Sequence, residues 1–174
     1  MIGVDEAAAC AIYSPYHCFR VEPTMNSKLA LVLFLLLVVG GGSLIGAMTA
    51  PGAWYASLTK PAFNPPNWVF GPVWTALYVL IAIAGWRIWR VRPRGQAMAA
   101  WWLQLVLNFL WSPVFFALHS LSGALVIISM LLAAIFWFIL AARRHDMVAA
   151  WLFAPYLAWV GFATLLNASL LWLN

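Results

Sequence analysis

Charged side chains are absent from long, mostly apolar stretches of this sequence. The uncharged stretches cover 29–59, 61–86, 95–142 and 147–174. A helix needs about 20 apolar residues to cross a membrane, so the stretch 95–142 has room for two such helices. The polar, glycine-containing segment 119–123 divides that stretch. The pattern predicts an all-α membrane protein, a bundle of five transmembrane helices over about 29–49, 67–90, 97–118, 122–143 and 147–171.

Composition narrows the class of protein. Only 7% of the residues are charged and 66% are hydrophobic, whereas soluble domains carry roughly 25% charged residues. These values exclude a soluble enzyme, a nucleic-acid-binding domain and a disordered tail. The net charge of +5 comes from residues between the apolar stretches and forms no continuous basic strip, so we expect a lipid bilayer as partner and no nucleic acid.

The segment before the first span is expected to be a poorly ordered leader, residues 1–28, followed by the transmembrane domain, residues 29–174. Met25 is an alternative start to Met1. Cys10, His17 and Cys18 lie in this leader but do not supply the four ligands of a structural zinc site, so we expect no metal.

The first apolar run has two interpretations. Lys28 followed by 29–39, with small residues at 47–50, resembles a signal peptide. The run stays largely apolar to about residue 50, which is long enough to span a membrane and favours a retained helix.

Basic residues predict the orientation. With five spans, one side holds eight of the nine lysines and arginines, and the other holds only Lys60. The positive-inside rule then places the N-terminus in the cytoplasm. We expect a bacterial inner membrane, with an outer membrane as the alternative.

The 12 tryptophans separate by depth. Eight lie near span ends, where interfacial anchoring is expected: Trp54, Trp68, Trp86, Trp89, Trp101, Trp102, Trp151 and Trp172. Four lie deeper: Trp74, Trp111, Trp137 and Trp159. Of these, Trp111 and Trp137 are expected in the core, because only the other two share a helix face with tyrosines and small residues.

Three helix faces carry candidate chemistry. They are Gly71, Trp74, Tyr78, Ala82 and Gly85; Gln104, Asn108 and Ser112; and Tyr156, Trp159, Ala163 and Asn167. Amides within a span should point into the bundle. Gln104 and Asn167 are expected to join helices, whereas Asn108 could equally join helices or contact a ligand.

Backbone breakers predict a cavity. Pro113 and Pro155 should kink the third and fifth helices. Gly42 and Gly46 either thin the first helix beside a cavity or form a close packing seam.

His119 is expected to be an interfacial residue without function. No acidic residue lies within a span, which argues against a proton-coupled pump and a Ser-His-Asp triad.

Several ordered motifs occur across three of the helices. The first loop contains Trp54-Tyr55-x-x-Leu58-x-Lys60-Pro61, and the second span contains Val73-Trp74-Thr75-x-Leu77-Tyr78. The third span contains Gln104-Leu105-x-Leu107-Asn108-x-x-Trp111-Ser112-Pro113-x-Phe115-Phe116, and the fifth contains Pro155-Tyr156-x-x-Trp159. In these motifs, from about residue 29 to 172, the chain resembles the TspO/MBR family of tryptophan-rich sensory proteins and translocator (peripheral benzodiazepine receptor) proteins.

The resemblance implies a five-helix bundle, usually a homodimer, with a pocket under the first loop. Family members bind porphyrins and haem-related tetrapyrroles, and some bind cholesterol or benzodiazepine-type drugs. By analogy, Tyr55 caps the pocket, Trp74 and Trp159 flank the ligand, Asn108 donates a hydrogen bond and Ala163 gives clearance. The remaining lining positions that match are Tyr78 and Phe115.

These implications give the functional expectation: a tetrapyrrole-binding membrane protein with a sensory, regulatory or transport role in porphyrin handling and stress response, which requires no cofactor. One alternative is light-dependent degradation of protoporphyrin, with Trp74 and Trp159 as the catalytic candidates. Another is sterol or lipid translocation. No basic residue follows Tyr156, so the short cholesterol-recognition pattern is incomplete.

Overall fold

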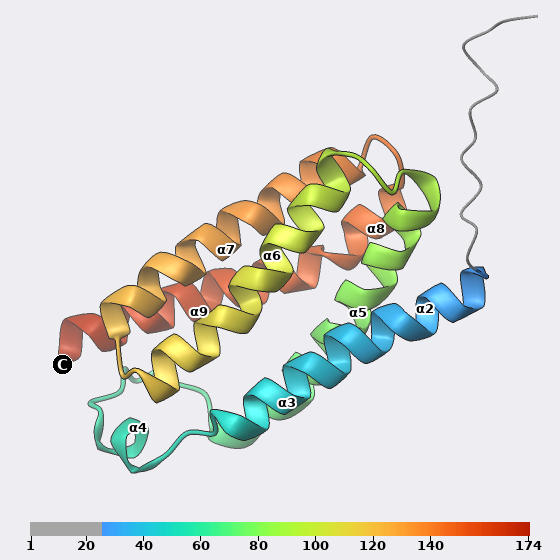
Figure 1. Ribbon diagram of the computed structural model, residues 1–174. Coiled ribbons are helices and arrows are strands. Elements are labelled where there is room, and N and C mark those ends of the chain that lie inside the picture. The colour runs from blue at the N-terminus through green and yellow to red at the C-terminus, as the bar shows by residue number, and fades with distance from the viewer. Residues whose placement is uncertain (1–25) are drawn as a thin grey trace, which may run out of the picture.

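The computed structural model describes residues 26–174, and in this part of the chain every regular element is helical. Five helical segments are long and apolar enough to cross a membrane: Ser27–Met48, Asn67–Val91, Gln96–Ala117, Leu121–Ala142 and Met147–Leu173. Their ends lie within two residues of the spans predicted from the sequence. The predicted class, an all-α bundle of five spanning helices, is therefore confirmed (Figure 1). Residues 1–25 of the predicted leader, with Cys10, His17, Cys18 and the alternative start Met25, lie outside the described residues, whereas Ser27 and Lys28 belong to the first helix.

The first span is one continuous helix built from α2 (Ser27–Leu35), the π-helical turn η1 (Leu36–Gly40) and α3 (Gly41–Met48). It begins where the Asn26 side chain accepts a hydrogen bond from the Lys28 amide at 2.9 Å, a helix-capping contact. Phe34 and Val38 are buried on its inner face, where α2 and η1 pack along α5. This segment is long and apolar enough to span a membrane, and that it is retained rather than cleaved as a signal stays a prediction.

The other spans complete the bundle. The first loop contains the short helix α4 (Ala53–Ser57) and the 3₁₀ turn η2 (Asn67–Val69), which leads into α5 (Phe70–Val91). Next come α6 (Gln96–Ser112) and α7 (Leu121–Ala142). α7 packs against both α6 and α9, and α4 lies at the end of the bundle where α6 passes into α7 (Figure 1).

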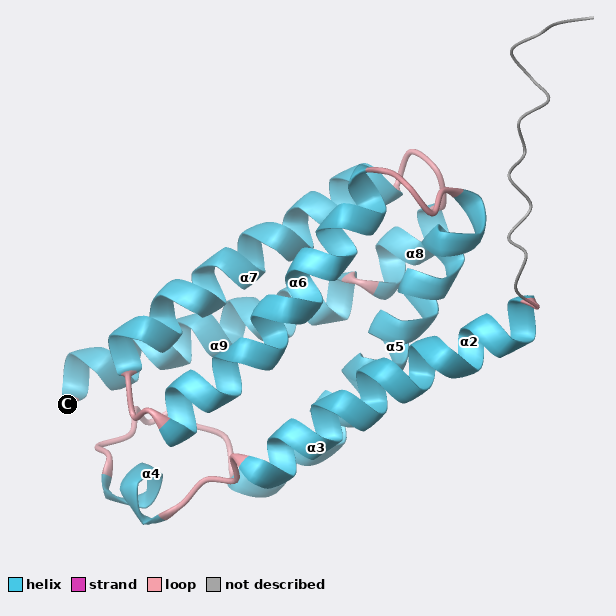
Figure 2. Ribbon diagram, in the orientation of Figure 1, coloured by secondary structure: helices cyan, strands magenta, loops and turns pink. Residues whose placement is uncertain are grey.

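Both predicted proline kinks are present. α6 gives way at Pro113 to the π-helical turn η3 (Pro113–Ala117). The last span is broken at Phe153 into α8 (Met147–Leu152) and α9 (Ala154–Leu173), with Pro155 in the first turn of α9. Proline lacks an amide hydrogen and its ring crowds the preceding turn, so a regular helix cannot pass through it unchanged. Figure 2 shows the short non-helical link between α8 and α9.

The core contains one tryptophan that was predicted to lie at the membrane interface, because it is near the end of a span in the sequence. Trp101, predicted as an interfacial anchor, is 0% exposed, and its Nε1 donates to the Ile81 carbonyl at 2.9 Å. Gly85 makes this possible, because a Cβ at that position would overlap the Trp101 indole. The neighbouring Trp102 is 46% exposed, since the next residue on a helix points in a different direction.

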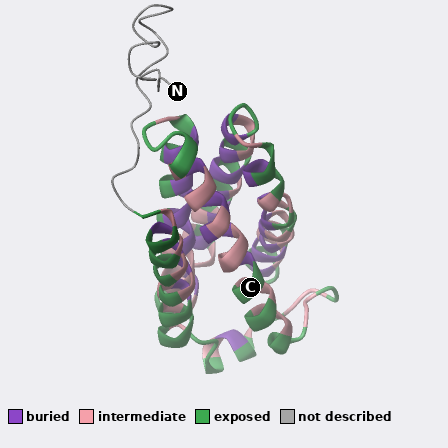
Figure 3. Ribbon diagram, turned by 90° about the vertical axis from the view of Figure 1, so that its right-hand side faces the viewer, coloured by how far each residue is buried: buried purple, intermediate pink, exposed green. Residues whose placement is uncertain are grey.

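Trp137 shows the opposite error. It was expected in the core but is 40% exposed on α7. Trp68, Trp151 and Trp172 are strongly exposed, as predicted for anchors. Figure 3 shows exposed positions along the outer faces of the helices and buried positions between them. The exposed side chains include many large apolar residues, which suits a surface that faces lipid rather than water.

An ion pair joins two helices at the basic end of the bundle. Arg87 Nε donates to Asp146 Oδ2 at 2.8 Å, and Arg87 Nη2 donates to Oδ1 at 3.1 Å. Asp146 also caps α8 by accepting from the Ala149 amide. Burial of Asp146 works against its ionisation, but hydrogen bonds from Arg87 and from the backbone outweigh it and hold the pKa of this carboxyl below its ordinary value.

We predict a pH dependence from this pair. A lowered pKa in the folded state means that Asp146 stabilises the fold above the ordinary Asp pKa of about 3.9 and that this contribution is lost as the pH falls through the folded-state pKa. Asp146→Asn should therefore lower the free energy of unfolding by about 1 kcal/mol at pH 7. The effect is small because Arg87 is partly exposed and solvent screens the ion pair. Thermal unfolding in detergent at pH 7 and pH 3 measures this. An equal destabilisation at both pH values would contradict it.

Candidate functional site

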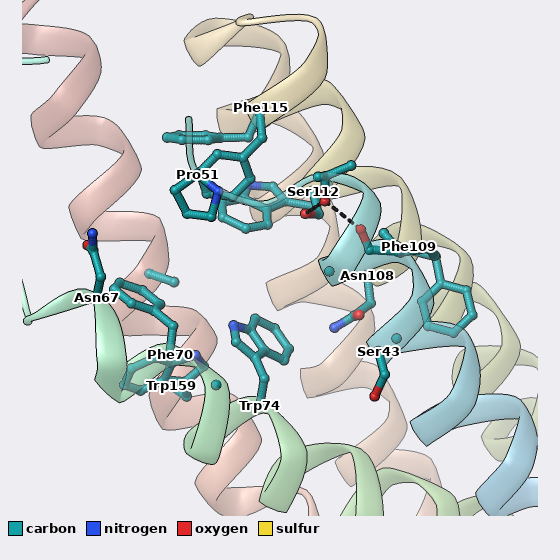
Figure 4. A pocket seen from close by; sticks show the side chains of 18 of the residues that line it. Ser43, Pro51, Asn67, Phe70, Trp74, Asn108, Phe109, Ser112, Phe115 and Trp159 are labelled. Carbon is teal, nitrogen blue, oxygen red and sulfur yellow. Dashed lines mark hydrogen bonds between the residues drawn. The ribbon is translucent and has the colours of Figure 1, made fainter. Parts of the chain in front are cut away.

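A cavity of about 390 Å³ lies at the end of the bundle that carries the first loop. This volume is within the range of about 300–1,000 Å³ typical of small-molecule sites. Side chains from α3, α5, α6, η3 and α9 form its wall, together with Pro51 and Tyr55 of the loop. In Figure 4, Trp74 points into the cavity between Phe70 and Trp159 on one side and Asn108 and Ser112 on the other.

All seven residues predicted as ligand contacts line this one cavity. Tyr55 comes from α4, Trp74 and Tyr78 from α5, and Asn108 from α6, whereas Phe115 belongs to η3 and Trp159 and Ala163 to α9. Helical spacing explains the grouping within each helix, because residues three or four positions apart share a face. That they bind a ligand stays a prediction.

Several residues that line the cavity were not predicted from the sequence as ligand contacts. They include Phe70, Phe109, Trp111 and Phe116. The signal for two of them was present, because Phe70 lies one helical turn before Trp74 and Trp111 lies one turn after Asn108. The prediction that Trp111 belongs only to the core is therefore incomplete, since this residue both packs against the core and faces the cavity.

Asn108 connects the cavity to a buried chain of polar groups. Its Nδ2 donates to the Tyr156 hydroxyl at 2.7 Å, and that hydroxyl donates to Gln104 Oε1 at 3.1 Å. The chain joins α6 to α9. Gln104 thus has the predicted helix-joining role. Asn108 joins helices as well, and it also lines the cavity, where it could contact a ligand.

A second polar contact holds the opposite part of the wall. Asn167 Nδ2 donates to the Leu121 carbonyl at 3.0 Å, and its Oδ1 accepts from Trp111 Nε1 at 3.3 Å. Asn167 therefore links α9 to both α6 and α7, as predicted. Because uncharged amides are costly in lipid unless they are paired, these bonds fix how the three helices face one another.

Trp159 contributes a fully buried polar group to the wall. Its Nε1 is buried and has no hydrogen-bond partner within residues 26–174. A buried donor without an acceptor costs about 1–3 kcal/mol, so native proteins rarely leave one. An indole N–H in this state beside a cavity is available to a ligand acceptor. Among the described residues, those that line the cavity include no charged side chain.

The first loop covers the cavity through aromatic contacts. Tyr55 is buried, its ring packs edge-on against Phe115 and Phe116, and its hydroxyl donates to Asn64 Oδ1 at 3.2 Å. Burial raises the pKa of the Tyr55 hydroxyl, with the Asn64 hydrogen bond acting in the opposite direction. Lys60 Nζ lies 4.8 Å from the centre of the Tyr55 ring, a cation–π distance.

Two further contacts hold the loop at its edges. Trp54 stacks on His119, with ring centres 4.3 Å apart, so the histidine expected to have no role has a packing role. The Asn174 side chain pairs with the Thr59 backbone, accepting from its N–H at 2.9 Å and donating to its carbonyl at 3.1 Å. These contacts tie the loop to the α6–α7 turn and to the end of α9.

The chain is similar to known proteins along most of its length. The sequence model of the TspO/MBR family matches residues 31–173. The chain is 40% identical over 153 residues to the "Tryptophan-rich sensory protein" of Cereibacter sphaeroides, covering 86% of this chain and 95% of that protein. It is 35% identical over 154 residues to "Protein CrtK" of Rhodobacter capsulatus, covering 86% and 95%. It is also 37% identical over 123 residues to the human "Translocator protein", covering 66% and 70%.

We predict that Tyr156→Phe destabilises the fold by about 1–3 kcal/mol, because it leaves both the Asn108 amide and the Gln104 carbonyl without their shared partner. Tyr78→Phe is the matched control, since its hydroxyl has no hydrogen-bond partner within residues 26–174. Thermal unfolding followed by near-ultraviolet circular dichroism compares the two. Equal losses would contradict the role assigned to the polar chain.

Proposed function

We propose that this chain, an integral membrane protein that belongs to the TspO/MBR family, binds a tetrapyrrole, a flat ligand with a largely apolar ring system, in the cavity under its first loop. Porphyrin and haem-related molecules are the ligand class. Binding serves a sensory, regulatory or transport role in porphyrin handling and the response to stress.

The observation that carries the proposal is the wall of the cavity. It combines several aromatic rings with neutral polar groups and no charged side chain within the described residues. A flat aromatic ligand gains affinity in such a site from ring contacts and from burial of its apolar surface. A compact charged metabolite would instead lose its hydration without gaining an ion-pair partner.

Each of the seven residues has a proposed role. Trp74 and Trp159 flank the ring system of the ligand, and the free Trp159 N–H donates to an acceptor on it. Asn108 already donates one hydrogen to Tyr156, and its amide carries a second for the ligand. Tyr55 closes the site from the loop. Tyr78, Phe115 and Ala163 shape the remaining wall.

We further propose how the protein sits in its membrane. Lys28, Arg87, Arg90, Arg92, Arg94, Arg143 and Arg144 all lie near the end of the bundle opposite to the first loop, which contains only Lys60. This asymmetry supports a cytoplasmic N-terminus in a bacterial inner membrane, so the cavity faces the outer side. A homodimer is the proposed assembly.

We predict that Trp74→Phe together with Trp159→Phe weakens protoporphyrin IX binding by about 10- to 100-fold, since ring area and a hydrogen-bond donor worth about 1–3 kcal/mol are lost. Binding is measured by saturable quenching of tryptophan fluorescence in detergent or nanodiscs. Trp137→Phe, on the exposed face of α7, is the matched control and should leave the affinity unchanged. Equal affinity in all three proteins would refute the site, and failure of the unsubstituted chain to bind would refute the ligand class.

Fusion reporters test the orientation. A reporter that is active only outside the cytoplasm should work when joined after Asn174 and fail when placed between Arg92 and Gln96, in the loop that precedes α6. A fluorescent protein that folds only in the cytoplasm should show the reverse. The reverse result for both reporters would place the first loop inside the cell.

A further inference from the structure

The cavity opens sideways between the first helix and α5. Close contact between these helices ends at Gly42, where an added Cβ would overlap the Tyr78 ring. One turn further along the first helix, a Cβ on Gly46 would meet no atom within 4 Å. On α5, a Cβ on Gly71 would likewise meet nothing within 4 Å. The two helices therefore diverge from the Gly42–Tyr78 contact towards the first loop.

The residues at this gap belong to the cavity and to the outer surface at once. Ser43 and Gly46 on α3, and Gly71 and Thr75 on α5, are all exposed, and all line the cavity. They are small, so they leave the gap unfilled. Thr75 donates its hydroxyl hydrogen to the Gly71 carbonyl at 2.9 Å, a bond within the helix that lets a hydroxyl face lipid at low cost.

Contacts between neighbouring elements hold the other walls of the cavity. On its other side, α3 is held against α6, because Gly41 touches the Phe109 ring and the Thr49 hydroxyl pairs with the Ser112 hydroxyl. From the aqueous side, the first loop covers the cavity with the buried Tyr55 and its contacts to Phe115 and Phe116. Within the described residues, the exposed part of the cavity wall therefore follows the gap between α3 and α5, with Pro51 and Asn67 at the end of the gap nearest the first loop.

We propose that this gap is a portal through which the cavity exchanges its ligand with the lipid bilayer, and that Gly46 and Gly71 keep the portal open. The ligand class is then a molecule that dissolves in the membrane before it binds. The identity of that molecule rests on the proposed function, whereas the opening itself does not. Both glycines lie inside helices that span the membrane, so the portal faces lipid in the half of the bundle nearest the first loop.

Blocking the portal tests the proposal. Gly46→Leu combined with Gly71→Leu places two side chains in open space, so the fold should tolerate the change. In nanodiscs, stopped-flow quenching by protoporphyrin IX should show association and dissociation slowed in parallel, each by about tenfold, as a raised barrier requires. The equilibrium affinity should change much less than either rate.

Gly40→Leu is the matched control. Gly40 is also a helical glycine of the first span with no atom within 4 Å of its Cβ position, and it does not line the cavity. Its exchange rates should equal those of the unsubstituted chain. A double variant with unchanged rates would overturn the portal, and so would one whose weaker affinity comes from faster dissociation alone, because that result indicates a clash inside the cavity.

A second readout needs no tetrapyrrole. In nanodiscs made with phosphatidylcholine that carries bromine near the headgroup end of its acyl chains, lipid entering the portal should quench Trp74. Total tryptophan quenching should then be smaller in the double variant than in Gly40→Leu and the unsubstituted chain. Equal quenching in all three overturns the portal. Failure of protoporphyrin to bind, with the quenching difference present, overturns the proposed ligand class and leaves the portal standing.

Discussion

Every polar group inside this bundle must find its partner within the protein, because the surrounding hydrocarbon offers none. This constraint determines how the helices face one another. The Tyr156 hydroxyl lies between Asn108 and Gln104, Asn167 joins α9 to two other helices, and the Trp101 indole reaches the Ile81 carbonyl. Apolar side chains gain little from leaving lipid for a protein interior, so these few directional bonds carry much of the specificity of packing. Two buried donors lack a partner within residues 26–174, Gln104 Nε2 and Trp159 Nε1, and the second lies beside the cavity.

The positions of the helices were predictable from the sequence because span length follows from the thickness of the bilayer. Pro113 and Pro155 were equally readable, since the effect of proline is local. The direction in which a tryptophan points was harder. Trp101 and Trp102 have the same depth in the sequence, yet only Trp101 is buried. The difference depends on Gly85 in another helix, and no feature near Trp101 in the sequence encodes that contact.

The residues of the candidate site were likewise predictable only in part. Helical spacing brought Trp74 together with Tyr78, and Trp159 together with Ala163, on single faces. The resemblance to a family supplied Tyr55 and Phe115, because their positions depend on how the loop folds over η3. Neither source predicted that Asn108 would be shared between the cavity and Tyr156. That arrangement joins residues 48 positions apart in the chain, and it arises only when α6 and α9 are packed together.

The pairing of Thr59 with Asn174 gives the site an unusual mechanical property. Asn174 directly follows α9, the helix that carries Trp159 and Ala163. An α-helix is stiff over this length, with a rise of about 1.5 Å per residue. A shift of α9 that widened the cavity would therefore have to stretch or break the two hydrogen bonds to the loop. The end of α9 and the covering loop are therefore joined at the surface of the protein, at some distance from the cavity itself.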